Sequence, residues 1–119
     1  GFLNMERLLA RDERPTAVIC ASTALALGAV RSLNQRGLKP GREVSLIAHD
    51  DVLPLLKPVN FSVPLTTTRS SLRAAGMRIA ERLINQIKSG EPNTDQELWK
   101  AELVVRGSTG PAPTRNADA

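Results

Sequence analysis

Apolar positions along the chain follow two patterns, and the first is the short continuous run. Residues 16–21 (TAVICA) and 44–48 (VSLIA) are such runs, which are typical of parallel strands buried on both faces. Residues 65–68 predict a further extended segment, because three consecutive threonines favour β structure. A last strand is predicted at about 98–105.

The second pattern is helical spacing. Apolar residues recur every three or four positions at 2–12, 24–36 and about 71–89, which predicts three amphipathic helices. Ser22 or Thr23 is placed to cap the second of them. The alternation of strands and helices predicts an α/β fold in which helices flank a parallel sheet.

Composition and charge change this picture little. The chain has 119 residues, of which 41% are hydrophobic and 24% charged, as expected for one globular domain or part of one. The formal net charge is +4. Basic residues are interleaved with acidic ones, so the charge indicates a solvated surface and not a nucleic-acid footprint.

The counts of cysteine and histidine limit the chemistry. Cys20 is the one cysteine, so no disulfide can form within the chain, and a lone buried thiol fits a reducing cytoplasm. No apolar run is long enough to cross a bilayer. We therefore expect a cytoplasmic protein with no membrane segment, no cofactor and no metal site.

Polar side chains follow the two apolar strands. Ser22 and Thr23 follow the first, and His49, Asp50 and Asp51 follow the second. Ligands of open α/β sheets bind beyond the carboxyl ends of the strands, so Ser22 and Asp50 should face the same crevice. A carboxylate beside hydroxyls accepts paired hydrogen bonds from the vicinal hydroxyls of a sugar. An Asp after a strand is also a common loop residue, and both interpretations of Asp50 stay open.

A hydrolase that uses His49 and Asp50 is an alternative. Metal hydrolases gather several His and Asp ligands, whereas this chain has one His. The chain also lacks the Gly-x-Ser-x-Gly elbow of serine hydrolases. The sequence therefore predicts no catalytic residue and no enzyme.

The second predicted helix offers a candidate interface. The residues expected to pack on the sheet are Ala26, Ala29, Val30 and Leu33. Leu27 and Arg31 would then project from the flank, and Phe61 lies in a Pro-rich loop. Leu27 and Phe61 would suit a dimer interface, or they would belong to the core.

Eight segments form an ordered pattern over nearly the whole chain. They are 15–22 (PTAVICAS), 26–30 (ALGAV), 37–38 (GL), 44–47 (VSLI), 50–51 (DD), 64–69 (PLTTTR), 72–76 (LRAAG) and 103–109 (LVVRGST). No single motif is decisive, but the ordered set resembles the LacI/GalR family of transcriptional regulators.

The resemblance implies a type I periplasmic-binding-protein-like effector domain, built from two α/β lobes that crossover segments join. Residues 1–110 resemble the C-terminal part of this effector-binding and dimerisation domain, a half-domain in which helix 71–89 resembles a piece of the N-terminal lobe. Residues 111–119 are expected to be a flexible tail, and the Pro-, Ala- and Thr-rich composition predicts fraying from Gly107 onward.

The resemblance also implies residue roles. The first acid of the Asp-Asp pair, Asp50, would contact effector hydroxyls, and His49 stands where the family often has an aromatic residue. Ser22 and Thr23 replace the family's usual Asn and acid, and Ser70 replaces a Gln after the crossover. These departures imply a ligand pocket whose polar side chains extend less far toward the ligand than is usual in the family.

We therefore expect the ligand-sensing domain of a DNA-binding repressor that responds to a sugar or related small molecule. The flank at Leu27, Arg31 and Phe61 resembles the family's dimer interface, so a homodimer is expected. The family contacts DNA through an N-terminal helix-turn-helix, which these 119 residues do not include. A sugar-binding protein of a transporter shares the fold and is the second interpretation.

Overall fold

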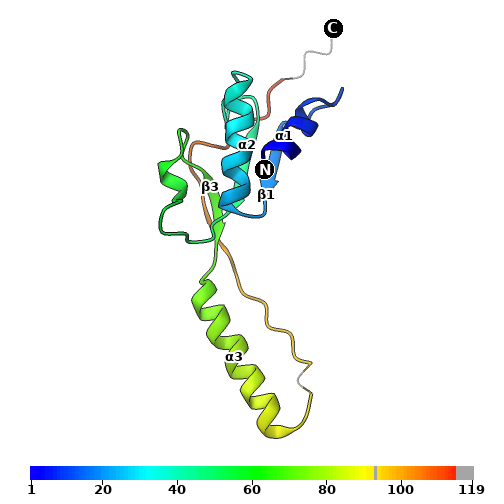
Figure 1. Ribbon diagram of the computed structural model, residues 1–119, viewed down its shortest axis with the longest axis vertical. Coiled ribbons are helices and arrows are strands. Elements are labelled where there is room, and N and C mark those ends of the chain that lie inside the picture. Colours follow the sequence, from blue (N-terminus) through cyan, green and yellow to red (C-terminus); the bar gives the residue numbers. More distant parts are fainter. Residues whose placement is uncertain (93, 115–119) are drawn as a thin grey trace. The chain divides into compact units, whose positions relative to one another are not determined.

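The computed structural model describes residues 1–92 and 94–114, in which helices and strands alternate (Figure 1). The elements in chain order are α1 (Phe2–Leu9), β1 (Ala17–Cys20), α2 (Thr23–Gln35), β2 (Ser45–His49), the 3-10 helix η1 (Pro58–Asn60), β3 (Thr66–Arg69), α3 (Leu72–Ser89) and β4 (Glu102–Val104). The chain divides into two units. Unit 1 comprises residues 1–69 and the chain from 103 onward, and unit 2 comprises residues 70–102.

The strands form one sheet in the order β1-β2-β3-β4. β1 pairs with β2 in parallel, with Val18 opposite Leu46, and β2 pairs with β3 in parallel, with His49 opposite Thr68. Helix α2 connects β1 to β2 and packs on both. The predicted α/β fold with a parallel sheet is thus confirmed.

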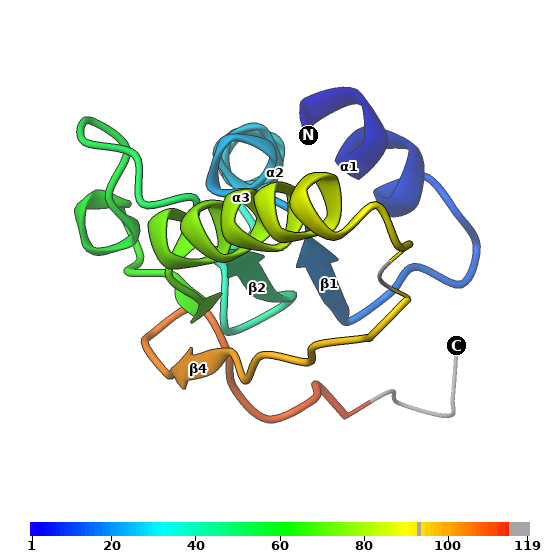
Figure 2. The ribbon, with the colours of Figure 1, turned by 90° about the horizontal axis from the view of Figure 1, so that it is seen from below.

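The core of unit 1 lies between the sheet and the helices on one of its faces. Figure 2 shows α1 and α2 on the same side of β1 and β2. The buried apolar side chains are Met5, Leu9, Cys20, Ala26, Ala29, Val30, Leu33, Val44, Leu46, Ala48, Phe61 and Leu65. The four helix residues that the sequence assigns to the sheet-facing side of α2 are all among them.

Helix α1 docks on α2 through a close approach and an ion pair. A Cβ at Gly28 would lie 2.5 Å from the Phe2 amide nitrogen, so the helices meet where α2 has no side chain. Glu6 accepts a hydrogen bond from Ser32 and forms an ion pair of 2.7 Å with Arg36. The Arg36 hydrogen bond, followed by that of Ser32, lowers the pKa of Glu6 to about 2.

The face of β1 that points away from the helices is exposed. Ile19 is 79% exposed and Ala17 is also exposed, whereas Cys20, on the helix side, is buried. The prediction that the first strand is buried on both faces is therefore wrong here. The physical reason is that α1 and α2 lie on the same side of β1, which is an edge strand of the sheet.

The C-terminal strap, residues 106–110, is bonded into the sheet of unit 1. The fully buried Ser108 hydroxyl donates to the Leu46 carbonyl (2.6 Å) and accepts from the Thr66 amide (2.7 Å). The Leu46 amide donates to the Ser108 carbonyl (2.7 Å). The expected fraying from Gly107 is therefore wrong for the strap, because a composition typical of loops does not reveal hydrogen bonds to distant strands.

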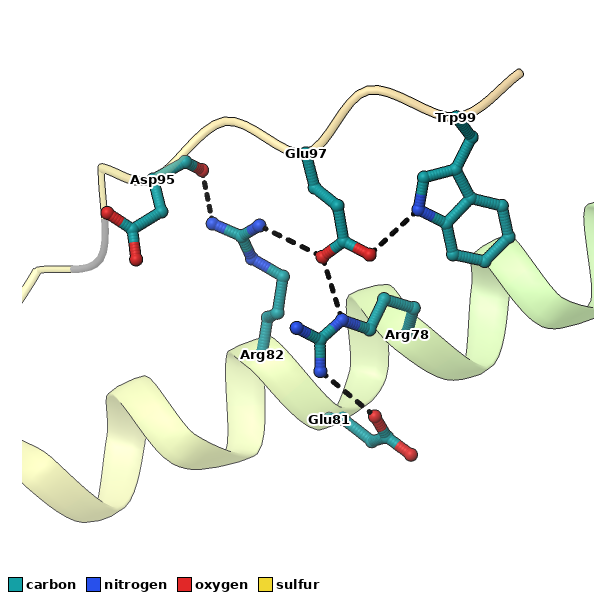
Figure 3. A network of polar contacts seen from close by, with 6 residues as sticks. All are labelled: Arg78, Glu81, Arg82, Asp95, Glu97 and Trp99. Atoms are coloured by element: carbon teal, nitrogen blue, oxygen red, sulfur yellow. Dashed lines mark hydrogen bonds and ion pairs between the residues drawn. The ribbon is translucent and has the colours of Figure 1, made fainter.

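Unit 2 consists of α3 and the extended segment 94–102. Ser71 caps the first turn of α3, and Gly90 ends the helix in the left-handed conformation (φ +68°). The Glu97 carboxylate accepts hydrogen bonds from Arg78 (2.8 Å), Arg82 (3.4 Å) and the Trp99 indole (2.8 Å), which fastens the segment along the helix (Figure 3).

Three predicted element boundaries need correction or completion. The first helix ends at Leu9 and not at 12. Of the strand predicted at 98–105, only Glu102–Val104 is formed, because a strand needs a bonded neighbour and residues 98–101 have none among the described residues. Of the predicted tail 111–119, residues 111–114 form neither helix nor strand, and 115–119 lie outside the described residues.

Among the described residues, no helix has the length and apolar content needed to cross a membrane.

Candidate functional site

The carboxyl ends of β1, β2 and β3 meet at one edge of unit 1 and carry most of the predicted ligand residues. Ser22 follows β1 and caps α2, since its Oγ accepts a hydrogen bond from the Leu25 amide (3.1 Å). Its side chain therefore has a structural function at the edge where the sequence predicts a ligand contact.

Asp50 lies at the carboxyl end of β2 and is 8% exposed. Its amide donates to the Thr68 carbonyl (2.8 Å), which fixes its backbone to β3. Its Oδ1 accepts from the Val52 amide (2.9 Å), and Val52 has a φ of +54°, an unusual conformation for a β-branched residue. Within the described residues Oδ2 has no hydrogen-bond partner and is not a fully buried atom, so it can accept bonds from a ligand.

His49 lies beside a residue that sequence reasoning missed as a site candidate. Its Nδ1 is 3.1 Å from Oγ1 of Thr68, the residue opposite it in β3. Both side chains are partly exposed. The run of three threonines was the available signal, but a β-branched run is explained by strand propensity alone, and only the register shows which threonine faces His49.

Thr23 and Asp51 bond to each other across the ends of β1 and β2. The Thr23 amide donates to Oδ2 of Asp51 (2.9 Å), and the Asp51 amide donates to Oγ1 of Thr23 (3.4 Å). The Thr23 hydroxyl donates to the His49 carbonyl (3.2 Å). Thr23 has no exposed surface, so the structure does not present this predicted ligand residue to solvent. Asp51 is a second residue whose part in the site the sequence did not reveal.

The structure does not assemble a hydrolase site from His49 and Asp50. The His49 ring is hydrogen-bonded to Thr68, and the Asp50 carboxylate to the Val52 amide. Within residues 1–92 and 94–114, no cluster of three or more His, Cys, Asp or Glu is placed to hold a metal ion. The remaining predicted ligand residue, Ser70, is a partly exposed residue of unit 2.

The flank of α2 carries a pocket of about 540 Å³. Leu27, Arg31 and Phe61, the three predicted interface residues, all line it. Leu27 is 50% exposed, so it is not a core residue, whereas Phe61 is buried and forms part of the core. The Arg31 guanidinium carbon lies 5.5 Å from the centre of the Phe2 ring, within the range of a cation–π contact.

Comparison of the sequence with known families and proteins gives consistent matches. The profile of the periplasmic binding protein-like domain matches residues 2–109. The HTH-type transcriptional regulator AglR of Rhizobium meliloti (strain 1021) is 66% identical over 98% of this chain and 33% of its own length. The HTH-type transcriptional regulator MalR of Streptomyces coelicolor is 42% identical over 89% of this chain and 29% of its own. The chain thus spans about a third of the curated relatives it matches.

Solved structures give the same result for the fold. A LacI family transcriptional regulator from Bifidobacterium animalis subsp. lactis superposes with a TM-score of 0.75 at 28% identity, over 93% of this chain and 40% of that one. The lac repressor dimer bound to operator and the anti-inducer ONPF also has a TM-score of 0.75, at 29% identity, over 92% of this chain and 37% of that one.

Proposed function

The chain belongs to the family of periplasmic binding protein-like domains, and we propose that it is part of the ligand-sensing domain of a LacI-type transcriptional repressor. The observation that carries the proposal is the family match over residues 2–109, which includes the polar edge formed by β1, β2 and β3. The names of the two curated relatives favour a regulator over an enzyme or a transport protein. Such a regulator acts in the cytoplasm, where Cys20 would stay reduced.

The ligand that suits this edge is a sugar or a related polyol. Oδ2 of Asp50 can accept hydrogen bonds from two vicinal hydroxyls, and hydrogen bonds to a charged acceptor are the stronger kind. The imidazole of His49 and the hydroxyls of Ser22 and Thr68 can exchange bonds with further hydroxyls. We assign the direct contacts to Asp50, Ser22 and His49.

We assign unit 1 to the C-terminal lobe of the sensing domain and helix α3 of unit 2 to a piece of the N-terminal lobe. The division of the chain into two compact units supports this assignment, because the boundaries between the units lie directly after β3 and within β4, where crossover segments are expected. Ser70 begins unit 2, and its contribution to the ligand site stays a prediction. Ligand binding would shift the equilibrium between two lobe arrangements and so alter operator affinity.

The flank of α2 is our candidate for the homodimer interface. The half-exposed Leu27 and the buried Phe61 line a pocket that also contains the cation Arg31. Interfaces combine an apolar centre with aromatic residues and Arg in this way, and the solved lac repressor with the TM-score of 0.75 is itself a dimer.

Substitution of Asp50 tests the ligand site. A hydrogen bond to a charged group contributes roughly 1.5–3 kcal/mol, so Asp50→Ala should weaken sugar binding about ten- to a hundredfold. The measurement is titration calorimetry of the full-length regulator with glucose, galactose, maltose, sucrose and lactose.

Asp12→Ala is the matched control, because Asp12 is an exposed acid of unit 1 outside the strand ends. It should bind the same sugars with wild-type affinity. Equal affinity of wild type and Asp50→Ala, with the fold intact, would show that the site is wrongly assigned. Absence of any sugar binding to the wild type would contradict the proposed ligand class.

A further inference from the structure

The two adjacent acids at the end of β2 have different surroundings. Asp50 uses one carboxylate oxygen for the Val52 amide and keeps the other without a partner in the described residues. Asp51 instead accepts from the Thr23 amide, the first residue of α2, at 2.9 Å. A carboxylate at this place is favoured twice, by an amide that has no intrahelical acceptor and by the positive end of the helix dipole.

The bond between Asp51 and Thr23 is reciprocal. Oγ1 of Thr23 accepts from the Asp51 amide at 3.4 Å and donates to the His49 carbonyl at 3.2 Å. The hydroxyl thus spans both sides of residue 50, by bonding to the carbonyl of the residue before it and to the amide of the residue after it. Thr23 is fully buried and Asp51 is partly exposed, so these part-buried bonds lie at the boundary of the core.

These contacts determine where Asp50 can point. On one side its amide is bonded to β3 through the Thr68 carbonyl. On the other side the next residue is held to α2, and the Val52 amide donates to Oδ1 of Asp50. Val52 itself takes a left-handed conformation. Such a conformation at Val persists only where neighbouring contacts enforce it, and the bonds of Asp51 to Thr23 are such contacts.

We propose that Thr23 and Asp51 are positioning residues, which form a latch that holds Asp50 toward the ligand without contacting the ligand themselves. This inference rests on the proposed ligand site at Asp50. It gives the Asp-Asp pair a division of roles, in which the first acid binds hydroxyls and the second fastens the loop to α2.

The residue type at position 23 is part of the inference. The Thr23 hydroxyl supplies an acceptor for the Asp51 amide and a donor for the His49 carbonyl, and it carries no charge. Valine has a shape similar to that of threonine but no hydroxyl, so it can neither accept from the Asp51 amide nor donate to the His49 carbonyl. Thr23→Val is therefore expected to weaken the latch, while Thr23→Ser, which keeps the hydroxyl, is expected to preserve it.

Amide exchange tests the latch without any ligand. In the ¹⁵N-labelled full-length protein, Asp51→Ala should speed exchange of the Thr23 amide tenfold or more, because its acceptor is lost. Asp51→Asn, which keeps an acceptor oxygen, should largely restore protection, and Asp12→Ala should leave it unchanged. Unchanged protection in Asp51→Ala would overturn the latch.

Sugar affinity tests whether the latch acts through Asp50. With the sugar that the wild type binds most tightly among glucose, galactose, maltose, sucrose and lactose, Asp51→Ala and Thr23→Val should each weaken binding about tenfold, and Thr23→Ser less than threefold. In an Asp50→Ala background the same substitutions should change affinity less than twofold, because they have no carboxylate left to position.

Equal losses in both backgrounds would mean a general structural effect and would overturn the positioning role. If Asp50→Ala weakens binding but Asp51→Ala and Thr23→Val do not, the latch is wrong and the ligand site stands. If Asp50→Ala itself has no effect, the proposed function fails, and the exchange experiment still decides whether the latch exists.

Discussion

Glu6 shows how one side chain couples helix docking to pH. Its carboxylate is bonded to Arg36 and Ser32 of α2, and these bonds lower its pKa from 4.5 to about 2. A carboxyl group with a lowered pKa in the folded state stabilises that state above its unfolded pKa. The stabilisation is lost as the pH falls from about 4.5 toward 2.

We therefore predict that Glu6→Gln abolishes part of the acid sensitivity of unit 1. The free energy of unfolding of the wild type should fall between about pH 5 and pH 3, and that of the variant should fall less. Urea titrations at several pH values measure this difference. Glu13→Gln, at an exposed acid, should retain the wild-type slope, and equal slopes for wild type and Glu6→Gln would contradict the prediction.

Single residues also show which parts of the site the sequence can predict and which it cannot. The positions of Ser22 and Asp50 at neighbouring strand ends follow from chain order in a parallel sheet, and the structure places them there. The bonds of Asp51, Thr68 and Ser108 do not follow from chain order. Their partners lie 19 to 62 residues away in sequence, and polar spacing carries no signal for such distant pairs.

At the scale of elements, the docking of α1 on α2 depends on the absence of a side chain at Gly28. A methyl group at Gly28 would lie 2.5 Å from the Phe2 amide nitrogen and 3.0 Å from the Gly1 carbonyl carbon. Gly28→Ala should therefore displace α1 and lower the free energy of unfolding by about 1–3 kcal/mol, the usual cost of overpacking. Thermal and urea unfolding of the purified protein would measure the change.

Gly76 provides the opposite case on α3. A methyl group there meets nothing within 4 Å, so Gly76→Ala should be neutral or should stabilise by up to ~1 kcal/mol through helix propensity. The prediction fails if the two alanine variants have the same stability.

Element types were predictable because periodicity is a local property. The strands at β1 and β2 and the helices α2 and α3 lie close to their expected positions. The extent of β4 and the exposure of Ile19 were not predictable, because both depend on what packs or pairs beside the strand.

At the scale of the whole molecule, the flank of α2 is the proposed homodimer interface. Leu27→Asp would place a charge in the apolar centre of the proposed interface, where charged residues are depleted. We expect this variant of the full-length protein to sediment as a monomer at concentrations where the wild type is a dimer. Analytical ultracentrifugation measures the difference.

Leu3→Asp is the control for Leu27→Asp, because Leu3 is 69% exposed on α1 and does not line the flank pocket. It should remain a dimer. A dimeric Leu27→Asp protein would place the interface elsewhere.

The strap has a consequence for the order in which the protein forms during synthesis. The Leu46 carbonyl bonds to the Ser108 hydroxyl, which is synthesised 62 residues later, and the Thr66 amide bonds to the same hydroxyl 42 residues later. Until Ser108 has left the ribosome, β2 and β3 carry polar backbone groups without their final partners. An incomplete sheet of this kind is prone to aggregation. Unit 2 lies wholly within this interval of the chain, so its local helix can form while unit 1 is still incomplete. Closure of the longer unit should then be the slow step of folding, since distant contacts form late.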